Sequence, residues 1–184
     1  MYRCLIANRG EIAVRIIRAC KELNIETVAI YAKGDEKSLH VSLADHTICI
    51  GEANPLDSYL NINRIITAAK VTGANAIHPG YGFLSESTHF VEAVEQNDIC
   101  FVGPNKSTIE MIGDKITARQ TVNRAGVPVI PGSDDEVQSV EEIKILAEEI
   151  GYPVVLKAAS GGGGKGIRIV KAVSYTHLRA HETR

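Results

Sequence analysis

The sequence lacks a long apolar run, an excess of either charge, and any tryptophan. A membrane-spanning helix needs roughly 18 consecutive apolar residues. The first strand pattern begins at about Tyr2 and leaves no room for a secretory signal peptide. The 20 basic and 22 acidic residues nearly balance, with no basic block of the kind that binds nucleic acid or anionic lipid. These absences predict a cytoplasmic protein with no nucleic-acid or membrane partner, whose anionic ligands are small.

Cysteine is scarce as well. The four cysteines, at positions 4, 20, 49 and 100, are widely spaced and form no C-x-x-C pair. This spacing argues against a zinc site or a redox pair. A chain of 184 residues that is 45% hydrophobic does not need disulfides to hold its core together. We therefore expect Cys4, Cys20, Cys49 and Cys100 to be reduced thiols that behave as small buried hydrophobes.

Strand and helix patterns alternate over the first hundred residues. Apolar, β-branched segments are followed by segments whose apolar residues recur every three or four positions. Strands are predicted over 3–7, 27–31, 46–50, 76–78 and 99–102, and helices over about 11–23, 62–71 and 85–97. The alternation predicts right-handed βαβ crossovers and an α/β fold with a parallel, Rossmann-like sheet.

Local signals place the ends of several helices. Asn8 and Glu11 have the spacing of a capping box, and Ser85 is the predicted cap of the helix over 85–97. Gly113 ends one short helix, and Asp114 caps the next, so we place a domain boundary at this point. The apolar stripe of the first helix comprises Ile12, Ile16, Ala19, Cys20 and Leu23, with Arg15, Arg18 and Glu22 elsewhere on its surface.

The segment VVLKAASGGGGKGIRIV, residues 154–170, is the strongest candidate for a binding site. In its first strand, Val154 and Leu156 share one face, and Lys157 lies on the other. The glycines follow in a strand-loop-strand hairpin, where backbone N–H groups can approach phosphate oxygens because no Cβ intervenes. A phosphate clamp is one interpretation, and a wide or flexible glycine loop is the other.

Two better-known phosphate motifs do not fit this segment. Walker A requires G-x-x-x-x-G-K-[ST], but Ala159 stands where its first glycine should be, and Gly166 follows Lys165. The dinucleotide fingerprint requires a helix directly after the glycines, whereas a strand pattern follows here.

Two other candidates are weaker on local sequence alone. Lys115 lies in the first turn of its predicted helix, where a bound anion would offset the dipole; alone, it also fits a solvated surface lysine. Tyr81 and Gly82 follow a predicted strand at the edge where parallel sheets bind ligands, but they equally fit a tight structural turn. His78 is interpreted as a structural histidine, and the acidic run 134–136 as a solvated loop.

Six segments together carry a family resemblance. They resemble the amino-terminal part of biotin carboxylase, an ATP-grasp family, over nearly all of residues 1–170. They are IANRGEIAVRIIRACKEL (6–23), AIHPGYGFLSE (76–86), FVGP (101–104), GDK (113–115), AGVPVIPGS (125–133) and GYPVVLKAASGGGGKGIRIV (151–170).

The resemblance implies a domain plan and a set of roles. Residues 1–113 would form the Rossmann-like pre-ATP-grasp domain, and residues 114–171 would begin the ATP-grasp domain. Lys115 and Lys157 match lysines that contact ATP phosphates, and Tyr81 and Gly82 lie in the motif that faces bicarbonate and biotin. The family's mobile glycine-rich lid matches Gly161, Gly162, Gly163, Gly164, Lys165 and Gly166. The helix that the family uses for dimerisation carries Arg15, Arg18 and Glu22.

The implied reaction is the ATP-dependent carboxylation of biotin held on a biotin carboxyl carrier protein, as in acetyl-CoA carboxylase of fatty acid biosynthesis. Bicarbonate attacks the γ-phosphoryl group, and the resulting carboxyphosphate supplies CO2 to the biotin ureido nitrogen. The family's Mg2+ ligands, general base and biotin-side arginine fall beyond residue 184. We therefore expect no catalytic residue and no metal ligand in this chain, and an inactive isolated fragment of a homodimeric parent.

Residues 172–184 do not continue the family pattern and look like translated cloning sequence. His177 and His181 have metal-ligand spacing but lack the glutamate of H-E-x-x-H. Three alternatives remain for the function: a non-catalytic nucleotide-binding or dimerisation module, another ATP-grasp ligase such as a carbamoyl-phosphate synthase, and a dinucleotide oxidoreductase. The oxidoreductase ranks last, because residues 7–10 lack the glycine fingerprint.

Overall fold

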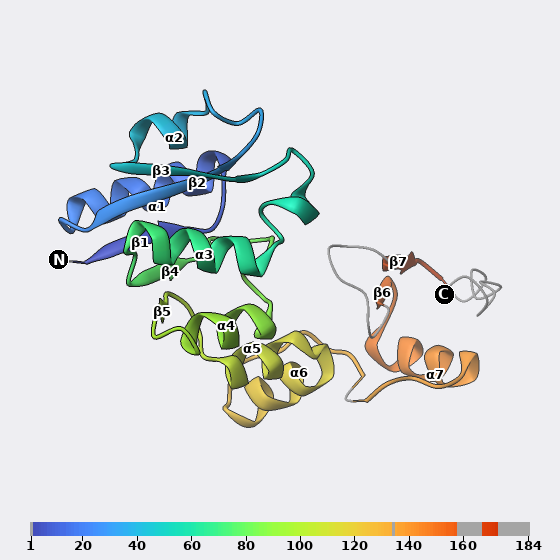
Figure 1. The fold of residues 1–184 in the computed structure, drawn as a ribbon. Coiled ribbons are helices and arrows are strands. Elements are labelled where there is room, and N and C mark those ends of the chain that lie inside the picture. The colour runs from blue at the N-terminus through green and yellow to red at the C-terminus, as the bar shows by residue number, and fades with distance from the viewer. Residues whose placement is uncertain (1, 134, 158–166, 173–184) are drawn as a thin grey trace. The chain divides into compact units, whose positions relative to one another are not determined.

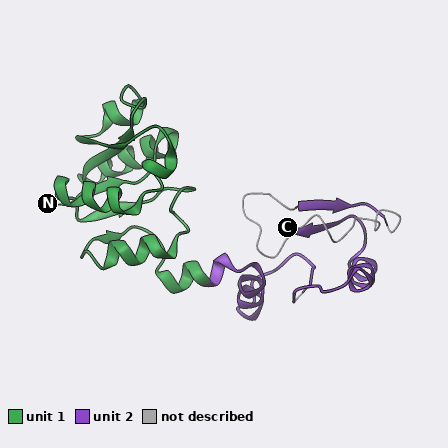
Figure 2. Ribbon diagram, turned by 45° about the vertical axis from the view of Figure 1, so that its right-hand side comes forward, with its two compact units in different colours: residues 1–110 green, residues 111–184 purple. Residues whose placement is uncertain are grey.

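The structure, a computed structural model, describes residues 2–133, 135–157 and 167–172. Its contacts divide the chain into two compact units, residues 1–110 and 111–184 (Figure 2). The predicted glycine loop over 161–166 lies outside the described residues, and so does the tail from residue 173 onward. The division falls close to the predicted domain boundary after Gly113, which itself stays a prediction.

The first unit is built on a parallel sheet of five strands in the order β3-β2-β1-β4-β5 (Figure 1). β1 lies at the centre, where Cys4 pairs with Thr27 on one side and with Ala76 on the other. The strand order reverses between β1 and β4, and the expected α/β fold is confirmed. The strands are β1 (Arg3–Ile6), β2 (Glu26–Ala32), β3 (His46–Gly51), β4 (Ala76–His78) and β5 (Cys100–Phe101).

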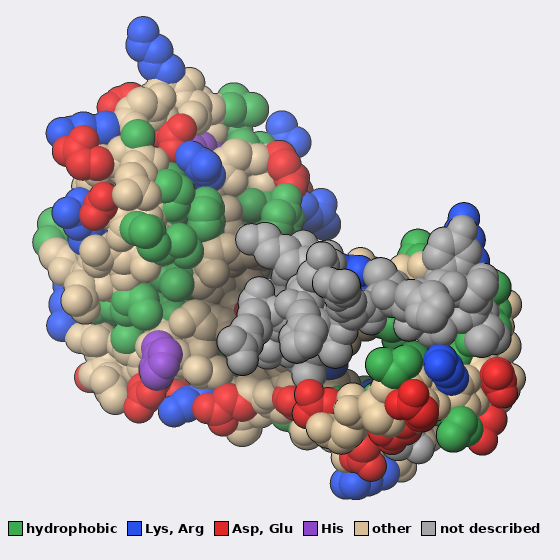
Figure 3. Space-filling model, turned by 90° about the vertical axis from the view of Figure 1, so that its right-hand side faces the viewer, with side chains coloured by type: hydrophobic (Ala, Val, Ile, Leu, Met, Phe, Trp, Pro, Cys, Tyr) green, Lys and Arg blue, Asp and Glu red, His purple; other side chains and the backbone are tan. Residues whose placement is uncertain are grey.

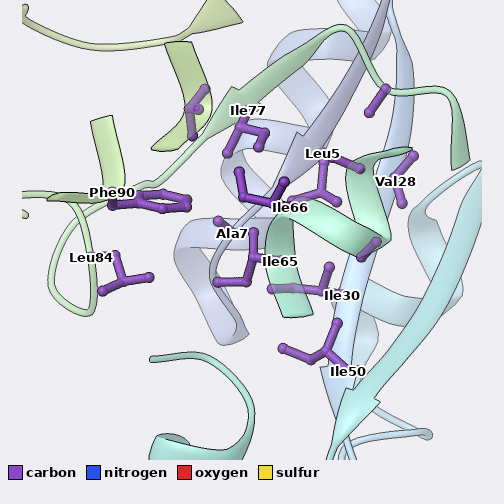
Figure 4. Close-up of a cluster of buried hydrophobic side chains, with 14 of the residues drawn as sticks. Leu5, Ala7, Val28, Ile30, Ile50, Ile65, Ile66, Ile77, Leu84 and Phe90 are labelled. Carbon is purple, nitrogen blue, oxygen red and sulfur yellow. The ribbon is translucent and has the colours of Figure 1, made fainter. Parts of the chain in front are cut away.

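Helices cover both faces of this sheet. α1 (Gly10–Glu22) and α2 (Leu39–Leu43) pack on one face. A short 3-10 turn, η1 (Pro55–Asp57), precedes α3 (Ile62–Thr72), which packs on the other face with α4 (Thr88–Glu95). Because side chains alternate along a strand, Ile6 belongs to the α1 cluster and Leu5 to the α3 cluster. Figure 4 shows the α3 cluster, where side chains from β1, β2, β4, α3 and α4 converge.

Two predicted caps are wrong. α1 has Arg9 at its N-cap with no side-chain cap, because the Asn8 amide is used elsewhere. α4 is capped by Ser87, whose hydroxyl accepts from the Phe90 N–H, and not by Ser85. The predicted stripe of α1 is wrong in part as well. Ala19 is exposed because the buried face of the helix passes through Ile17 and Cys20, and Leu23 is exposed because the helix ends at Glu22. The buried side chains of α1 are Ala13, Val14, Ile16, Ile17 and Cys20.

The cysteines are all free, but only two of them are buried. Cys4 and Cys20 both belong to the α1 cluster, where the interaction with the Cys4 side chain lowers the pKa of Cys20. Cys49 and Cys100 are exposed, in contrast to the prediction. They lie on β3 and β5, the two edge strands of the sheet, whose side chains are less covered.

The second unit has fewer buried side chains. α5 (Lys106–Gly113) runs across the division, followed by α6 (Lys115–Arg124) and α7 (Val140–Ile150). β6 (Val154–Lys157) and β7 (Ile167–Val170) form an antiparallel hairpin, as predicted. Among the described hydrophobic residues after position 110, only Ala147 and Val170 are buried.

Charged side chains are distributed over the surface. On the face drawn in Figure 3, basic and acidic side chains are interspersed with hydrophobic ones. None of the helices in the described part of the chain has the length and apolar character that a membrane span requires.

Candidate functional site

The turn after β4 lies at the carboxyl edge of the sheet, next to the segment that follows β1. These two strands are neighbours where the strand order reverses, the position at which open parallel sheets commonly bind ligands. The turn passes through positive φ at Gly80 (66°), Gly82 (67°) and Phe83 (41°). Tyr81 is 60% exposed, and Gly82 is exposed beside it. The predicted pair therefore lies on the outer surface of this turn.

Asn8 fixes this turn through side-chain hydrogen bonds on its buried side. Its side chain is buried, and its Nδ2 donates to the Pro79 carbonyl at 2.8 Å and to the Tyr81 carbonyl at 2.7 Å. Its Oδ1 accepts from the Arg9 N–H at 2.9 Å. The amide thus joins the turn after β1 to the turn after β4.

Arg9 and Phe83 belong to an aromatic stack. The Phe83 ring lies parallel to the Tyr59 ring, with centroids 5.2 Å apart and an interplanar angle of 7°. The Arg9 guanidinium lies 5.1 Å from the Tyr59 centroid and 5.7 Å from that of Phe83, within reach of a cation–π interaction. Asp35 pairs with Arg9 at 3.2 Å and accepts from the Tyr59 hydroxyl at 2.7 Å. Burial, helped by that hydrogen bond, raises the pKa of Tyr59.

Two contacts fix the ends of the turn. The Tyr81 hydroxyl donates to Glu11, the first acidic residue of α1, which raises the pKa of Tyr81. His78 Nδ1 accepts from the Gly80 N–H at 3.0 Å, and burial lowers the pKa of His78. A neutral imidazole that accepts from the backbone is in keeping with the structural role expected for this histidine.

The hairpin of the second unit places Lys157 as the strand pattern predicts. Val154 and Leu156 are half-buried, whereas Val155 and Lys157 are exposed on the opposite face. Lys157 pairs with Ile167 of β7. Gly161, Gly162, Gly163, Gly164, Lys165 and Gly166, the predicted lid, lie outside the described residues.

Lys115 is the first residue of α6 and is exposed. Asp114 caps this helix, since its Oδ1 accepts from the Thr117 N–H at 2.7 Å. That hydrogen bond holds the pKa of Asp114 below its usual range, so the carboxylate stays charged beside Lys115. The joint contact of Lys115 and Lys157 with one phosphate chain stays a prediction.

The charged residues predicted for the dimer face lie together on α1. Arg15, Arg18 and Glu22 are all exposed, and so is Leu23 just beyond the helix end. A hollow of ≈ 450 Å³ between β3 and α3, lined in part by Ile50 and Arg64, includes none of the predicted site residues.

The sequence prediction did not assign the residues behind the Tyr81 turn to a site. The sequence pattern gives Arg9, Asp35 and Tyr59 no role in a site, and it indicates only a capping role for the Asn8 side chain. One signal was present, because Asn8 and Arg9 directly follow the first strand and so lie at the same sheet edge as residues 79–83. Knowing that β1 and β4 are neighbours would have been needed to use it.

Two family models match different parts of this chain. Residues 1–109 match the family described as "Biotin carboxylase, N-terminal domain", and residues 114–182 match "Carbamoyl-phosphate synthase L chain, ATP binding domain". The chain therefore belongs to the biotin carboxylase family.

Individual members of this family are similar to the chain over most of its length. The chain is 56% identical over 169 residues to biotin carboxylase 1 of Bacillus subtilis, covering 92% of this chain and 38% of the relative. A crystal structure of a biotin carboxylase–β,γ-ATP complex from Campylobacter jejuni matches with a TM-score of 0.85 and 50% identity, covering 94% of this chain and 39% of that one.

A third relative is the biotin carboxylase domain dimer of Hydrogenobacter thermophilus 2-oxoglutarate carboxylase, whose structure contains MgADP, ADP and bicarbonate. It matches with a TM-score of 0.81 and 55% identity, over 92% of this chain and 37% of that one. The chain thus spans well under half the length of the relatives it matches.

Proposed function

We propose that this chain is the amino-terminal part of a biotin carboxylase, an ATP-dependent carbon–nitrogen ligase. The supporting observation is the 56% identity to a biotin carboxylase over 169 residues, which is 92% of this chain. In the proposed reaction, bicarbonate attacks the γ-phosphoryl group of ATP, and carboxyphosphate delivers CO2 to the ureido nitrogen of carrier-bound biotin. The partners would be ATP, bicarbonate and a biotin carboxyl carrier protein.

The described residues can supply the binding part of this chemistry. Phosphoryl transfer depends largely on positioning and on neutralising charge, and an exposed lysine on a hairpin suits a phosphate contact. In this proposal Lys157 and Lys115 contact ATP phosphates, Gly161–Gly166 close over them, and the Tyr81–Gly82 turn faces the biotin end. Among the described residues, no three His, Cys, Asp or Glu side chains form a group that could hold a metal ion. The Mg2+ ligands are expected in the rest of the family's sequence.

The phosphate assignment is tested by titrating ATP against the chain and its Lys157→Ala variant. Loss of one charged contact should weaken ATP binding by at least about tenfold. Lys70→Ala is a matched control, because it removes an exposed lysine from α3 in the first unit. Unchanged affinity in Lys157→Ala, or equal losses in both variants, would reject the clamp.

The second candidate function is a non-catalytic module that supplies a dimer face. The exposed charged face of α1, with Leu23 70% exposed at its end, favours this reading. Sedimentation of the chain and of Arg18→Glu separates the two candidates. A dimer that dissociates in the variant, together with no ATP binding, would favour the module over the ligase.

The proposal also concerns the molecule that finally accepts the carboxyl group in the parent carboxylase. Acetyl-CoA carboxylase, and with it fatty acid biosynthesis in the cytoplasm, is the parent we propose, although one relative belongs to a 2-oxoglutarate carboxylase. Assaying the complete protein with acetyl-CoA and with 2-oxoglutarate as carboxyl acceptors distinguishes these parents. A carbamoyl-phosphate synthase would instead hydrolyse ATP without any dependence on biotin.

A further inference from the structure

The turn after β4 has a backbone conformation that is energetically unfavourable without support from surrounding residues. Gly80, Gly82 and Phe83 all have positive φ, and Phe83 is not glycine. Bulky residues rarely adopt this region, and they keep it only when surrounding contacts enforce it. The contacts around Phe83 and Gly80 therefore explain why the turn exists in this form.

Asn8 supplies one set of these contacts. Its Nδ2 donates to the carbonyls on both sides of Gly80, so both of its N–H groups are used to hold this conformation of the turn. The fit is close, because a Cβ placed on Gly80 would lie 2.9 Å from Asn8 Nδ2 and 3.1 Å from Ile12 Cγ1. Asn8 and Gly80 thus require each other.

Arg9 supplies the other set. Its guanidinium covers the stacked rings of Tyr59 and Phe83 and pairs with Asp35, which also accepts from the Tyr59 hydroxyl. Tyr59 is fully buried, and its oxygen also accepts from the Ala32 N–H at 3.0 Å. The Phe83 ring is therefore linked to β2 through Tyr59, and it cannot move without losing its stacking contact with the Tyr59 ring.

The outer side of the turn is open in contrast. A Cβ on Gly82 would meet nothing within 4 Å, and Tyr81 is more than half exposed. The backbone of Tyr81 and Gly82 is thus held rigidly from behind while its front remains accessible. This is the arrangement expected of a preformed wall for a small ligand.

We propose that Asn8 and Arg9 are positioning residues that fix the Tyr81–Gly82 turn in the shape that the biotin-side substrate meets. The inference rests on the proposed function for the identity of that substrate. The rigidity of the turn rests on the contacts of the first unit alone. The two parts can therefore be tested separately.

The first test measures backbone amide exchange in this chain. Asn8→Asp replaces the donating amide by a carboxylate that repels both carbonyls, at nearly constant volume. Two amides report on the turn: the Gly80 N–H, bound to His78 Nδ1, and the Ser85 N–H, bound to the Gly82 carbonyl. We expect their exchange to accelerate by about tenfold, with unchanged exchange in β1 and β2.

The matched control is Asn61→Asp, the same chemical change at the N-cap of α3, where a carboxylate accepts equally well. Arg9→Gln should also accelerate both reporter amides, whereas Arg124→Gln, at an exposed site in α6, should not. Wild-type exchange at Gly80 and Ser85 in Asn8→Asp would overturn the proposal, and so would acceleration throughout the unit.

The second test uses the complete carboxylase that carries these residues, with free biotin, ATP and bicarbonate. Asn8→Asp should raise the KM for biotin by about tenfold and leave the KM for ATP unchanged. In the control variant Asn61→Asp, both KM values should equal those of the wild type. Equal changes in both KM values, or in neither, would overturn the positioning role. Absence of biotin-dependent ATP hydrolysis in the unsubstituted protein would overturn the proposed function and the substrate part of this inference. Amide exchange would still decide whether Asn8 and Arg9 fix the turn.

Discussion

The two sheets of this protein are covered very differently. In the first unit, helices pack on both faces of the sheet, and most side chains of β1 and β2 are buried. In the second unit, the β6–β7 hairpin keeps one face exposed, with Ile167 47% and Ile169 64% exposed on it. α6 has no buried residue at all.

This difference suggests that the first unit provides most of the stability, whereas the second unit provides exposed residues. The first unit has a core of its own and is large enough to fold as a domain. The described part of the second unit contributes exposed lysines and an apolar strand face rather than a core. Its segments should open with a small free energy, as expected where few apolar contacts are buried.

The strongest test of this comparison removes the same side chain from each unit. Ile65 is 0% exposed in the α3 cluster, and Ile130 is 85% exposed in the second unit. Ile65→Ala should lower the free energy of unfolding by about 2–5 kcal/mol, and Ile130→Ala should change it by no more than about 0.5 kcal/mol. Urea unfolding followed by circular dichroism measures both. Similar losses in the two variants would mean that stability is shared evenly.

Lowering the pH should decrease the folding stability of the first unit because His40 is buried. This side chain is buried, its Nε2 lies 3.3 Å from the Ile30 carbonyl, and its Nδ1 has no partner. Burial lowers the pKa of His40, so the unfolded state takes up a proton first as pH falls below about 6.5. Stability is therefore present above that pH and lost below it, at up to about 1.4 kcal/mol per pH unit.

His40→Gln is the variant that checks this effect. It should weaken the pH dependence of the unfolding free energy between about pH 6.5 and 5, even if it lowers stability at neutral pH. His89→Gln, at an exposed position of α4, should leave the dependence unchanged. An identical pH profile in His40→Gln and the wild-type chain would contradict the assignment.

The smallest effect compares two helix caps. Asn61 caps α3 through the Arg64 N–H, and Asp114 caps α6 through the Thr117 N–H. Asn61→Ala should lower the global free energy of unfolding by about 1 kcal/mol, because α3 packs in the core. Asp114→Ala should instead accelerate amide exchange within α6 and leave the unfolding midpoint of the first unit unchanged. A shifted midpoint in Asp114→Ala would show that the units unfold together.

Features set by neighbouring residues were predictable from the sequence. The Asp114 cap and the β6–β7 hairpin both follow from local periodicity and from cap residues a few positions apart. The exposed face of Lys157 followed from strand alternation alone. α2 was missed because five residues are too few to show a helical period.

Features set by distant residues were not predictable. Asn8 fits a capping box locally, but carbonyls 71 and 73 positions away hold its side chain instead. The exposure of Cys49 and Cys100 depends on which strands end up at the edges, and the sequence does not state that order. The support behind Tyr81 was missed for the same reason, since it joins segments that meet only in the folded sheet.

The central place of β1 also affects how this protein is made. Residues 3–6 are synthesised before residues 76–78, so the edge of β1 that pairs with β4 stays open until residues 76–78 have been made. Until then, a strand of the sequence Arg-Cys-Leu-Ile has an open edge that can pair with another chain. Binding by a chaperone at this stage, or fast elongation between these two segments, would therefore limit aggregation of the nascent polypeptide.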